Sequence, residues 1–428
     1  MKKVVQFIVI LLFTGILFAK GAEESQEPEP LKIVEVEMWI YDEMASSDDK
    51  AMVKAARDFE AINPGIKIVF QNVPHRGLMD KFIAASVTGE VPDVLHVALA
   101  WSIELGAMGH AEPLDSYIGK KRNELPPGAL ASSTYGGQLY GIPWYVDTTA
   151  LFYNKEMFLD AGLPLPGDKP MSWSELRTTA EKLTRDLDSD GKIDQYGYAM
   201  RKGRGASIAW FPYFWANGGE LYTEDGLSPN FNTREGLESF RFLNDMFTDG
   251  IMPPGTVAYD RWDDVRDAFV SGKMAMYVAG NWEIGPITDG ASFEWGIAPH
   301  PKEKVRSSFL GGSSFIIPKK AKQKDAAWKW LDFLTDSESM KYLAEYDRIP
   351  ARLDAGKAEH IMANPLFAPF AAEGAHARSH ASIYAGIIRS EVGAAFEEVM
   401  VTGKDPEQAL SDASDRVKAE MRDDMPGI

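Results

Sequence analysis

The first hundred residues carry the two hydrophobic periods that define strands and helices. Apolar and charged residues alternate along residues 33–40, and further strands are predicted at 66–73 and 93–98. Between them, residues 48–62 and 77–88 place apolar side chains three and four positions apart, which predicts two amphipathic helices. Strands that alternate with helices form βαβ units, so we expect an α/β fold with mostly parallel sheets.

The rest of the chain continues this mixture of elements. Ser172 and Glu175 stand at capping-box spacing, so a helix should begin there and run to about residue 184. Further helices are predicted at 234–248, 262–270, 326–334, 337–346 and 406–421, and strands at 150–153, 274–278 and 294–298.

Residues 140–163 combine turn residues, aromatic residues and one acid ahead of the predicted strand at 150–153. Gly141 and Pro143 cluster with Trp144, Tyr145 and Asp147. Side chains that precede a buried strand project from its end, so we expect this group to face a cleft.

Short sequence landmarks in this stretch, and others later in the chain, resemble family 1 of the extracellular solute-binding proteins. This family supplies the receptors of ABC importers and includes maltose-binding protein. The landmarks occur in order and at matching spacing: G-I-P, D-T, Y-N-K and A-G-L within 140–163, N-G-G at 217–219, G-K-M-A-M at 272–276, G-N-W at 280–282 and I-P-A-R at 349–352.

The resemblance implies two α/β lobes joined by hinge strands, with a ligand cleft between them. Lobe one would hold residues 31–148 and 297–347, and lobe two would hold 149–296 and 348–428. The chain would cross between the lobes at 140–163, near 294–298 and at 348–352. With 428 residues, the chain is also too long for one ordinary core.

The N-terminus has the pattern of a secretory signal peptide. Lys2 and Lys3 precede an apolar run from 4 to 18, and small residues near 19–21 suit a cleavage site. We therefore expect residues 1–21 to be removed and 22–30 to form a disordered leader. A membrane anchor is the alternative reading, although the run is short for a span.

Charge and cysteine content narrow the location and the partners. The formal net charge is −18, and removal of residues 1–21 makes it −21, which disfavours nucleic acid and anionic membranes as partners. The chain has no Cys, which excludes disulfides, thiolate metal sites and lipid attachment at an N-terminal Cys. A receptor without an anchor needs an outer membrane to retain it, so we expect a monomer in the periplasm.

The candidate ligand contacts are aromatic and charged residues at predicted loops and element boundaries. Flat rings suit the C–H faces of a sugar, and carboxylates, amides and guanidinium groups suit its hydroxyls. The residues predicted to bind the ligand are Trp39, Tyr41, Asp93, Trp101, Trp144, Tyr145, Asp147, Trp215, Asn217, Trp282, Arg348 and Arg352.

Each of these residues also has a structural interpretation. A Trp can pack in a core, Asp93 and Asn217 can cap turns, and Arg348 and Arg352 can form hinge ion pairs. The resemblance favours Trp282, because the family places an aromatic residue of the ligand site after the corresponding motif.

The loop at 186–194 has the spacing of a calcium-binding loop. Its acidic residues stand at alternate positions around a Gly at the sixth position and an acid at the ninth: Asp186, Asp188, Asp190 and Asp194. The twelfth position is Gly197 instead of the usual Glu. The loop therefore predicts either a structural Ca²⁺ site or a solvated turn held by Asx hydrogen bonds.

Together these patterns predict a receptor that is not an enzyme and requires no cofactor. It would bind a sugar or oligosaccharide and deliver it to the membrane permease of an ABC importer. Sequence motifs of P-loop ATPases, zinc proteases and serine esterases are absent. The alternatives are a secreted glycoside hydrolase and a receptor for a polyamine or a phosphorylated polyol.

Overall fold

The computed structural model describes residues 33–41, 44–75, 77–224 and 228–423. The predicted signal peptide at 1–21 and leader at 22–30 lie outside the described residues.

Strands β1 (Val34–Ile40), β2 (Ile66–Asn72) and β3 (Val94–Ala98) pair in parallel, as the βαβ pattern predicts. Helices α1 (Ala51–Ile62) and α2 (Leu78–Thr88) form the crossovers between them. Parallel neighbours need such crossovers, because the chain must return to the end at which the first strand began. The predicted elements of this region are thus confirmed, with ends shifted by one to three residues.

Strand β6 (Ile142–Asn154) is longer than predicted and connects two groups of strands. Its first half pairs with β9 (Ser308–Ile316) and β10 (Ile349–Pro350). Its second half pairs with β7 (Met276–Gly280) and β8 (Trp295–Ala298). All four pairings are antiparallel, which corrects the expectation of mostly parallel sheets. The reason is that β6 belongs to both groups of strands, and each of its neighbours runs in the opposite direction to it.

The helices form two groups, one near β1–β3 and one near β7 and β8. Helices near β1–β3 are α3 (Trp101–Ala107), α4 (Asp115–Ile118), α5 (Pro127–Ala131) and α12 (Lys324–Leu334). Helices near β7 and β8 are α6 (Lys155–Asp160), α7 (Trp173–Leu183), α8 (Arg204–Ala216), α9 (Arg234–Thr248), α10 (Trp262–Val270), α11 (Ile284–Gly290), α13 (Glu359–Ala363), α14 (Ala368–Gly374), α15 (Ala385–Thr402) and α16 (Pro406–Asp423). Short strands are β4 (Thr134–Tyr135), β5 (Gln138–Leu139) and β11 (Ala377–Arg378).

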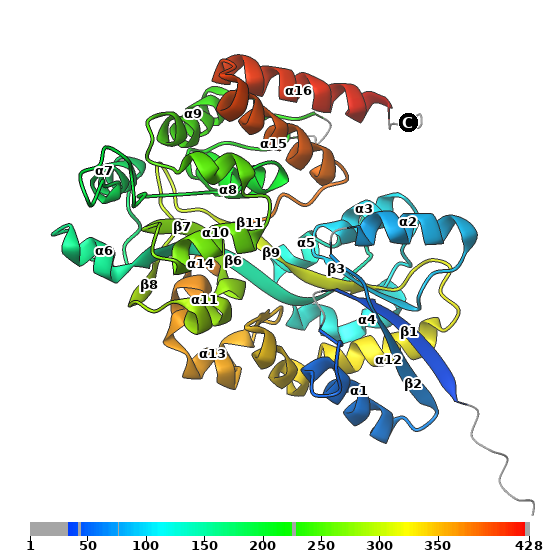
Figure 1. Ribbon diagram of the computed structural model, residues 1–428. Coiled ribbons are helices and arrows are strands. Elements are labelled where there is room, and N and C mark those ends of the chain that lie inside the picture. The colour runs from blue at the N-terminus through cyan, green and yellow to red at the C-terminus, as the bar shows by residue number, and fades with distance from the viewer. Residues whose placement is uncertain (1–32, 42–43, 76, 225–227, 424–428) are drawn as a thin grey trace, which may run out of the picture.

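Buried apolar side chains separate into two bodies, which Figure 1 shows side by side with β6 and β9 between them. The first body is built on β1–β3, α1–α5 and α12, and buries Phe59 and Trp330 in its core. The second body is built on β7, β8, the second half of β6, α6–α11 and α13–α16, and buries Phe152 and Trp210. Each body therefore excludes water from its own core.

The second crossing between the bodies differs from the prediction. The strand at 294–298 was expected to cross, but β8 pairs only with residues 151–154 of β6, inside the second body. The crossing strand is β9, which pairs with β11 at Ser308 and with β3 from Ser313 to Ile316. A local apolar pattern cannot distinguish these two strands, because the pairing of each is set by distant segments.

Among the described residues, no helix combines the length and the apolar character that a bilayer crossing requires.

Candidate functional site

A cavity of about 380 Å³ lies where the two bodies meet. Its polar and aromatic lining comes from loops and element ends of both bodies and from the crossing strands: Tyr41, His75, Trp101, Tyr145, Asp147, Arg201, Trp262, Trp282, Phe309, Arg348, His380 and Arg389. Six of the twelve residues predicted as ligand contacts lie here: Tyr41, Trp101, Tyr145, Asp147, Trp282 and Arg348.

Strand β6 places Tyr145 and Asp147 on the cavity side because side chains two positions apart share one face of a strand. The register between β6 and β9 shifts between Pro143 and Tyr145. Tyr41, which follows β1, approaches from the first body, and its hydroxyl lies 3.3 Å from that of Tyr145. Tyr41 stacks on buried His96 with ring centroids 4.0 Å apart. The floor of the cavity is therefore rigid and aromatic.

Asp147 is held in a fixed orientation by neighbours from both ends of the cavity. The side-chain amide of Asn281 donates to Asp147 Oδ1 at 2.9 Å and to the backbone oxygen of Asp347 at 2.8 Å. Arg348 Nη1 lies 3.8 Å from the same Asp147 oxygen, and its guanidinium lies over the ring of Tyr145 at 5.1 Å. This cluster presents an acid and a cation side by side, which suits polar ligand groups.

Indole and imidazole rings form two opposite walls. In the second body, Trp262 and Trp282 meet edge to face at a centroid distance of 5.1 Å, and Arg201 lies over Trp262 at 3.7 Å. In the first body, Trp101 stacks on His75 at 5.0 Å. Flat apolar surfaces thus face the cavity from both bodies.

Burial lowers the pKa of three basic groups at the cavity. It lowers the pKa of Arg201 to about 9, and the nearby Arg389 contributes to that change. It also lowers the pKa of Arg389 to about 10. Burial lowers the pKa of His380 well below its usual value, so this imidazole is neutral at pH 7.

Three predicted tryptophans lie outside the cavity lining, because each packs within one body. Trp39 donates from Nε1 to Glu37 at 2.8 Å and packs in the first body. Trp144 lies in the core of the first body and packs against a buried phenylalanine of β9, with ring centroids 4.8 Å apart. Trp215 lies on α8, a helix whose last twelve residues are almost all buried, and belongs to the core of the second body.

Asp93 and Asn217 also lie outside the cavity, and both organise backbone structure. Asp93 accepts hydrogen bonds from the backbone N–H groups of Glu37, Lys322 and Gln323 at 2.8–3.1 Å. Asn217 ends α8, and its side-chain amide donates to residues of α9. Their capping roles replace the predicted ligand contacts.

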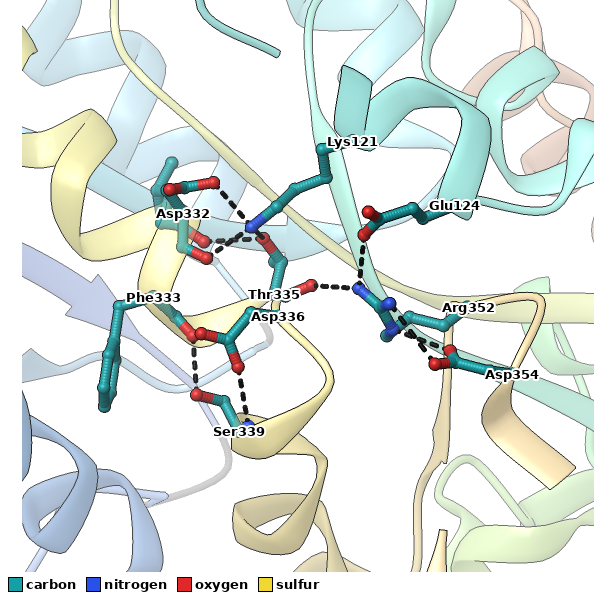
Figure 2. Close-up of polar contacts among 10 residues, drawn as sticks. Lys121, Glu124, Asp332, Phe333, Thr335, Asp336, Ser339, Arg352 and Asp354 are labelled. Carbon is teal, nitrogen blue, oxygen red and sulfur yellow. Dashed lines mark hydrogen bonds and ion pairs between the residues drawn. The ribbon is translucent and has the colours of Figure 1, made fainter. Parts of the chain in front are cut away.

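Arg352 forms ion pairs at the junction of the bodies instead of lining the cavity (Figure 2). Its Nη1 donates to Glu124 Oε2 and to the backbone oxygen of Thr335, both at 3.0 Å, and its Nε donates to Asp354 Oδ1 at 2.8 Å. The guanidinium is thus occupied by two carboxylates and one carbonyl, as the structural alternative predicted.

Six polar or aromatic lining residues were not predicted from the sequence: His75, Arg201, Trp262, Phe309, His380 and Arg389. Two of these residues could have been recognised from the sequence by an unusually placed charge. Arg201 begins a basic run, R-K-G-R, in a strongly acidic chain, and Arg389 interrupts the apolar sequence of α15. Charged groups in such settings are expected to have a specific partner or role.

The acidic loop is held by hydrogen bonds from its own backbone to its aspartates. Asp186 accepts from the backbone of Ser189 and Gly191, and Asp194 accepts from that of Leu187, at 2.7–2.8 Å. Ligand oxygens of Asp186, Asp188 and Asp194 lie within 4.8 Å of one another. Asp190 instead pairs with Lys192 at 3.1 Å, so it stands outside this group.

Comparison with known proteins supplies the family context of this site. The family model described as bacterial extracellular solute-binding protein matches residues 43–341. A maltotriose-binding protein of Pyrococcus abyssi is 26% identical over 387 residues, covering 86% of this chain and 78% of its own length. A Sinorhizobium fredii protein described as a probable amino-acid ABC transporter periplasmic-binding protein is 27% identical over 404 residues, covering 87% of this chain and 86% of its own.

A solved structure gives the same architecture. The ABC transporter solute-binding protein of Thermotoga lettingae, bound with alpha-D-tagatose, superposes with a TM-score of 0.80 at 25% identity, covering 90% of this chain and 99% of its own. The two-body α/β arrangement with a cavity between the bodies is therefore shared with a two-lobe solute-binding protein.

Proposed function

This chain belongs to the bacterial extracellular solute-binding protein family, and from that premise we propose that it binds a sugar or oligosaccharide between its two bodies and delivers it to the permease of an ABC importer. The observation that carries the proposal is the lining of the cavity. Indole faces of Trp262 and Trp282 stand beside the polar cluster of Asp147 and Arg348.

This combination matches the two surfaces of a saccharide. The C–H face of a sugar ring loses water favourably against an indole, and its hydroxyls need donors and acceptors of fixed direction. Hydrogen bonds that involve a charged group contribute roughly 1.5–3 kcal/mol each when well placed. The relatives named for maltotriose and tagatose support a sugar as the ligand class.

Transport requires that the ligand change the relation between the two bodies. Contacts from both sides of the cavity exist together only when the bodies are close, so the ligand stabilises the closed form by its differential affinity. The closed form would then dock on the permease.

A thermal-shift screen over mono- and oligosaccharides, with amino acids included, tests this function. A saccharide at about 100 times its dissociation constant should add roughly 2.7 kcal/mol to the free energy of unfolding. Stabilisation by an amino acid with no response to any saccharide would overturn the sugar assignment. The amino-acid arm is needed because the Sinorhizobium relative is described for that solute class.

We propose that the protein is not an enzyme. A glycoside hydrolase needs two carboxylates roughly 5–9.5 Å apart across the bond it cleaves. Among the described residues that line the cavity, Asp147 is the sole carboxylate. Release of reducing ends from an oligosaccharide at a turnover rate would contradict this proposal.

The location, the assembly and the cofactor need are also proposals. We infer that residues 1–21 direct export and are cleaved, that 22–30 form a leader, and that the protein acts as a periplasmic monomer without a required cofactor. The strongly acidic chain without Cys supports a soluble receptor without a lipid anchor. Cell fractionation tests the location, N-terminal sequencing of the mature protein tests the cleavage, and its mass in solution tests the assembly.

We propose a structural Ca²⁺ at Asp186, Asp188 and Asp194, because their ligand oxygens converge within 4.8 Å. Hard carboxylate oxygens are the ligands that this ion prefers. Calcium should raise the melting temperature, and Asp188→Asn should reduce that increase. An equal melting temperature with calcium and with a chelator would contradict the proposed calcium site.

A further inference from the structure

Two arginines at the cavity carry charge that no described residue neutralises directly. Arg201 lies just before α8, Arg389 lies on α15, and both line the cavity. Within the described residues, neither guanidinium makes a hydrogen bond or an ion pair, and both Nε atoms are buried without an acceptor. By contrast, Arg348 has Asp147 beside it at 3.8 Å.

Nearby carboxylates act on these cations only from a distance. Asp260, Glu283 and Asp264 attract Arg201, and Glu104 attracts Arg389. Three of these carboxylates also have partners of their own: Glu283 lies 3.8 Å from an arginine of α10, Asp264 accepts from the backbone at the start of α10, and Glu104 accepts from the backbone of α15. None of these four carboxylates lines the cavity that both arginines face.

An uncompensated cation at such a position lowers the stability of the protein. Burial and the nearby Arg389 lower the pKa of Arg201 to about 9, and burial and the nearby Arg204 lower the pKa of Arg389 to about 10, yet both groups remain protonated at neutral pH. Removing a cation from water without a partner is unfavourable. Two such cations that face one cavity favour the binding of an anion there.

We propose that the ligand is an acidic saccharide whose carboxylate binds between Arg201 and Arg389, as in a sugar built from uronic acid units. This inference rests on the proposed sugar-binding function and narrows its ligand class. It goes beyond that function by assigning the charge of the ligand and the two residues that recognise it.

The neighbours of Arg201 favour a carboxylate that is attached to a sugar ring. The guanidinium carbon of Arg201 lies 3.7 Å from the ring centroid of Trp262, and a guanidinium can donate in a fork toward two carboxylate oxygens. Trp282 meets Trp262 at 5.1 Å and continues the apolar wall. A ring resting on that wall can place its carboxylate at the arginines and its hydroxyls toward Asp147.

Isothermal titration calorimetry with matched ligand pairs tests the proposal. The pairs are D-glucuronate with D-glucose, D-galacturonate with D-galactose, and D-mannuronate with D-mannose, each also as short oligosaccharides, with the hexose 6-phosphates as a third arm. We expect the uronate member of at least one pair to bind about 10- to 100-fold tighter than its neutral partner. This preference should shrink as salt is added.

Three other outcomes of this titration would each contradict the acidic-ligand inference. Tighter binding of the neutral members would overturn the acidic-ligand inference and leave sugar binding standing. Preference for the phosphates would show an anion site that is not for carboxylates and would also overturn it. Absence of binding for every pair and every phosphate would count against both the inference and the proposed function.

Substitutions of the two arginines test whether they cause the preference for the uronate over the neutral sugar. In Arg201→Met and Arg389→Met, the affinity difference within the preferred pair should fall about tenfold or more. The unliganded melting temperature should stay equal or rise, because an unpaired buried cation is removed. Arg57→Gln, which changes an arginine paired with Asp48 on the surface of the first body, is the matched control. An unchanged preference in both Met variants would contradict the assignment.

Discussion

Trp282 is the aromatic residue whose side chain is best placed to bind a ring. It lies just after β7, remains partly exposed at the cavity, and meets Trp262 edge to face. Aromatic contacts of this kind contribute about 0.5–1.5 kcal/mol beyond the area that they bury.

Trp282→Ala should therefore weaken saccharide binding by about tenfold or more, measured by calorimetry. The matched control is Trp328→Ala, which removes a half-buried indole of α12 that packs on Tyr117 in the first body. Equal losses of affinity in the two variants would indicate a general effect on folding instead of a ligand contact.

Glu283 gives the molecule a pH dependence that can be measured without a ligand. Burial raises its pKa to about 7, against the attraction of Arg266, and Asp263 adds to the increase. The native state therefore keeps a proton on Glu283 that the unfolded chain releases near pH 4.5. Because the native state binds more protons between about pH 4.5 and 7, the free energy of unfolding falls as the pH rises through that interval.

In Glu283→Gln, this part of the pH dependence should disappear. The substitution should flatten the unfolding free energy between about pH 4.5 and 7, by up to about 3 kcal/mol. Urea titrations at several pH values measure it, and Glu90→Gln, on the exposed surface of the first body, is the control. The same slope in the variant and in the parent protein would show that Glu283 titrates normally.

Single residues were predictable where a strand or helix boundary truly exposes a side chain. Tyr41 after β1, Trp101 at the start of α3 and Trp282 after β7 all reach the cavity. Trp144 and Tyr145 are adjacent at an irregular point of β6, with ring centroids 5.2 Å apart, but only Tyr145 lines the cavity. Trp215 does not line the cavity, because the segment around it, predicted as a loop, is the end of a helix that is buried on every side.

At the scale of elements, the crossing of β6 and β9 depends on one glycine. Gly312 has a φ of +122°, and a Cβ built there would lie 2.2 Å from the backbone oxygen of Tyr145. L-residues with side chains rarely adopt that conformation, and a rigid backbone atom cannot move aside easily.

Gly312→Ala should destabilise the protein by roughly 2 kcal/mol or more, which chemical denaturation can measure. It should also weaken binding, because Tyr145 and Asp147 lie on the strand that would be displaced. Gly374→Ala is the control, since a Cβ at that position meets nothing within 4 Å. If both substitutions proved equally mild, the close approach of β9 to β6 would not be required.

Element types followed from the sequence more reliably than element pairing. Helices α9 and α10 begin and end at the predicted residues, and the capping box of Ser172 and Glu175 is present at the start of α7. These features depend on neighbours within four residues. The choice of β9 over β8 as a crossing strand depends on partners more than a hundred residues away, which periodicity does not encode.

At the scale of the whole molecule, the two bodies touch through α3 and α15 beside the cavity. Glu104 of α3 accepts a hydrogen bond from the backbone N–H of Gly386, at the start of α15, at 3.1 Å. A carboxylate at a helix N-terminus is favourable because of the unpaired N–H groups there. Glu104 does not line the cavity, so this contact joins the bodies without touching a ligand.

Because the hydrogen bond can form only when the bodies are close, Glu104 should favour the closed form and thereby the affinity. Glu104→Ala should weaken saccharide binding about 3- to 10-fold, although the variant keeps every lining residue of the cavity. Small-angle X-ray scattering should show a smaller radius of gyration for the parent protein at saturating ligand, and the variant should need more ligand to reach it. Unchanged affinity together with an unchanged radius would mean that closure of these two bodies is not coupled to binding. In that case, the shared cavity would be a rigid pocket, and delivery to a permease would need another structural signal.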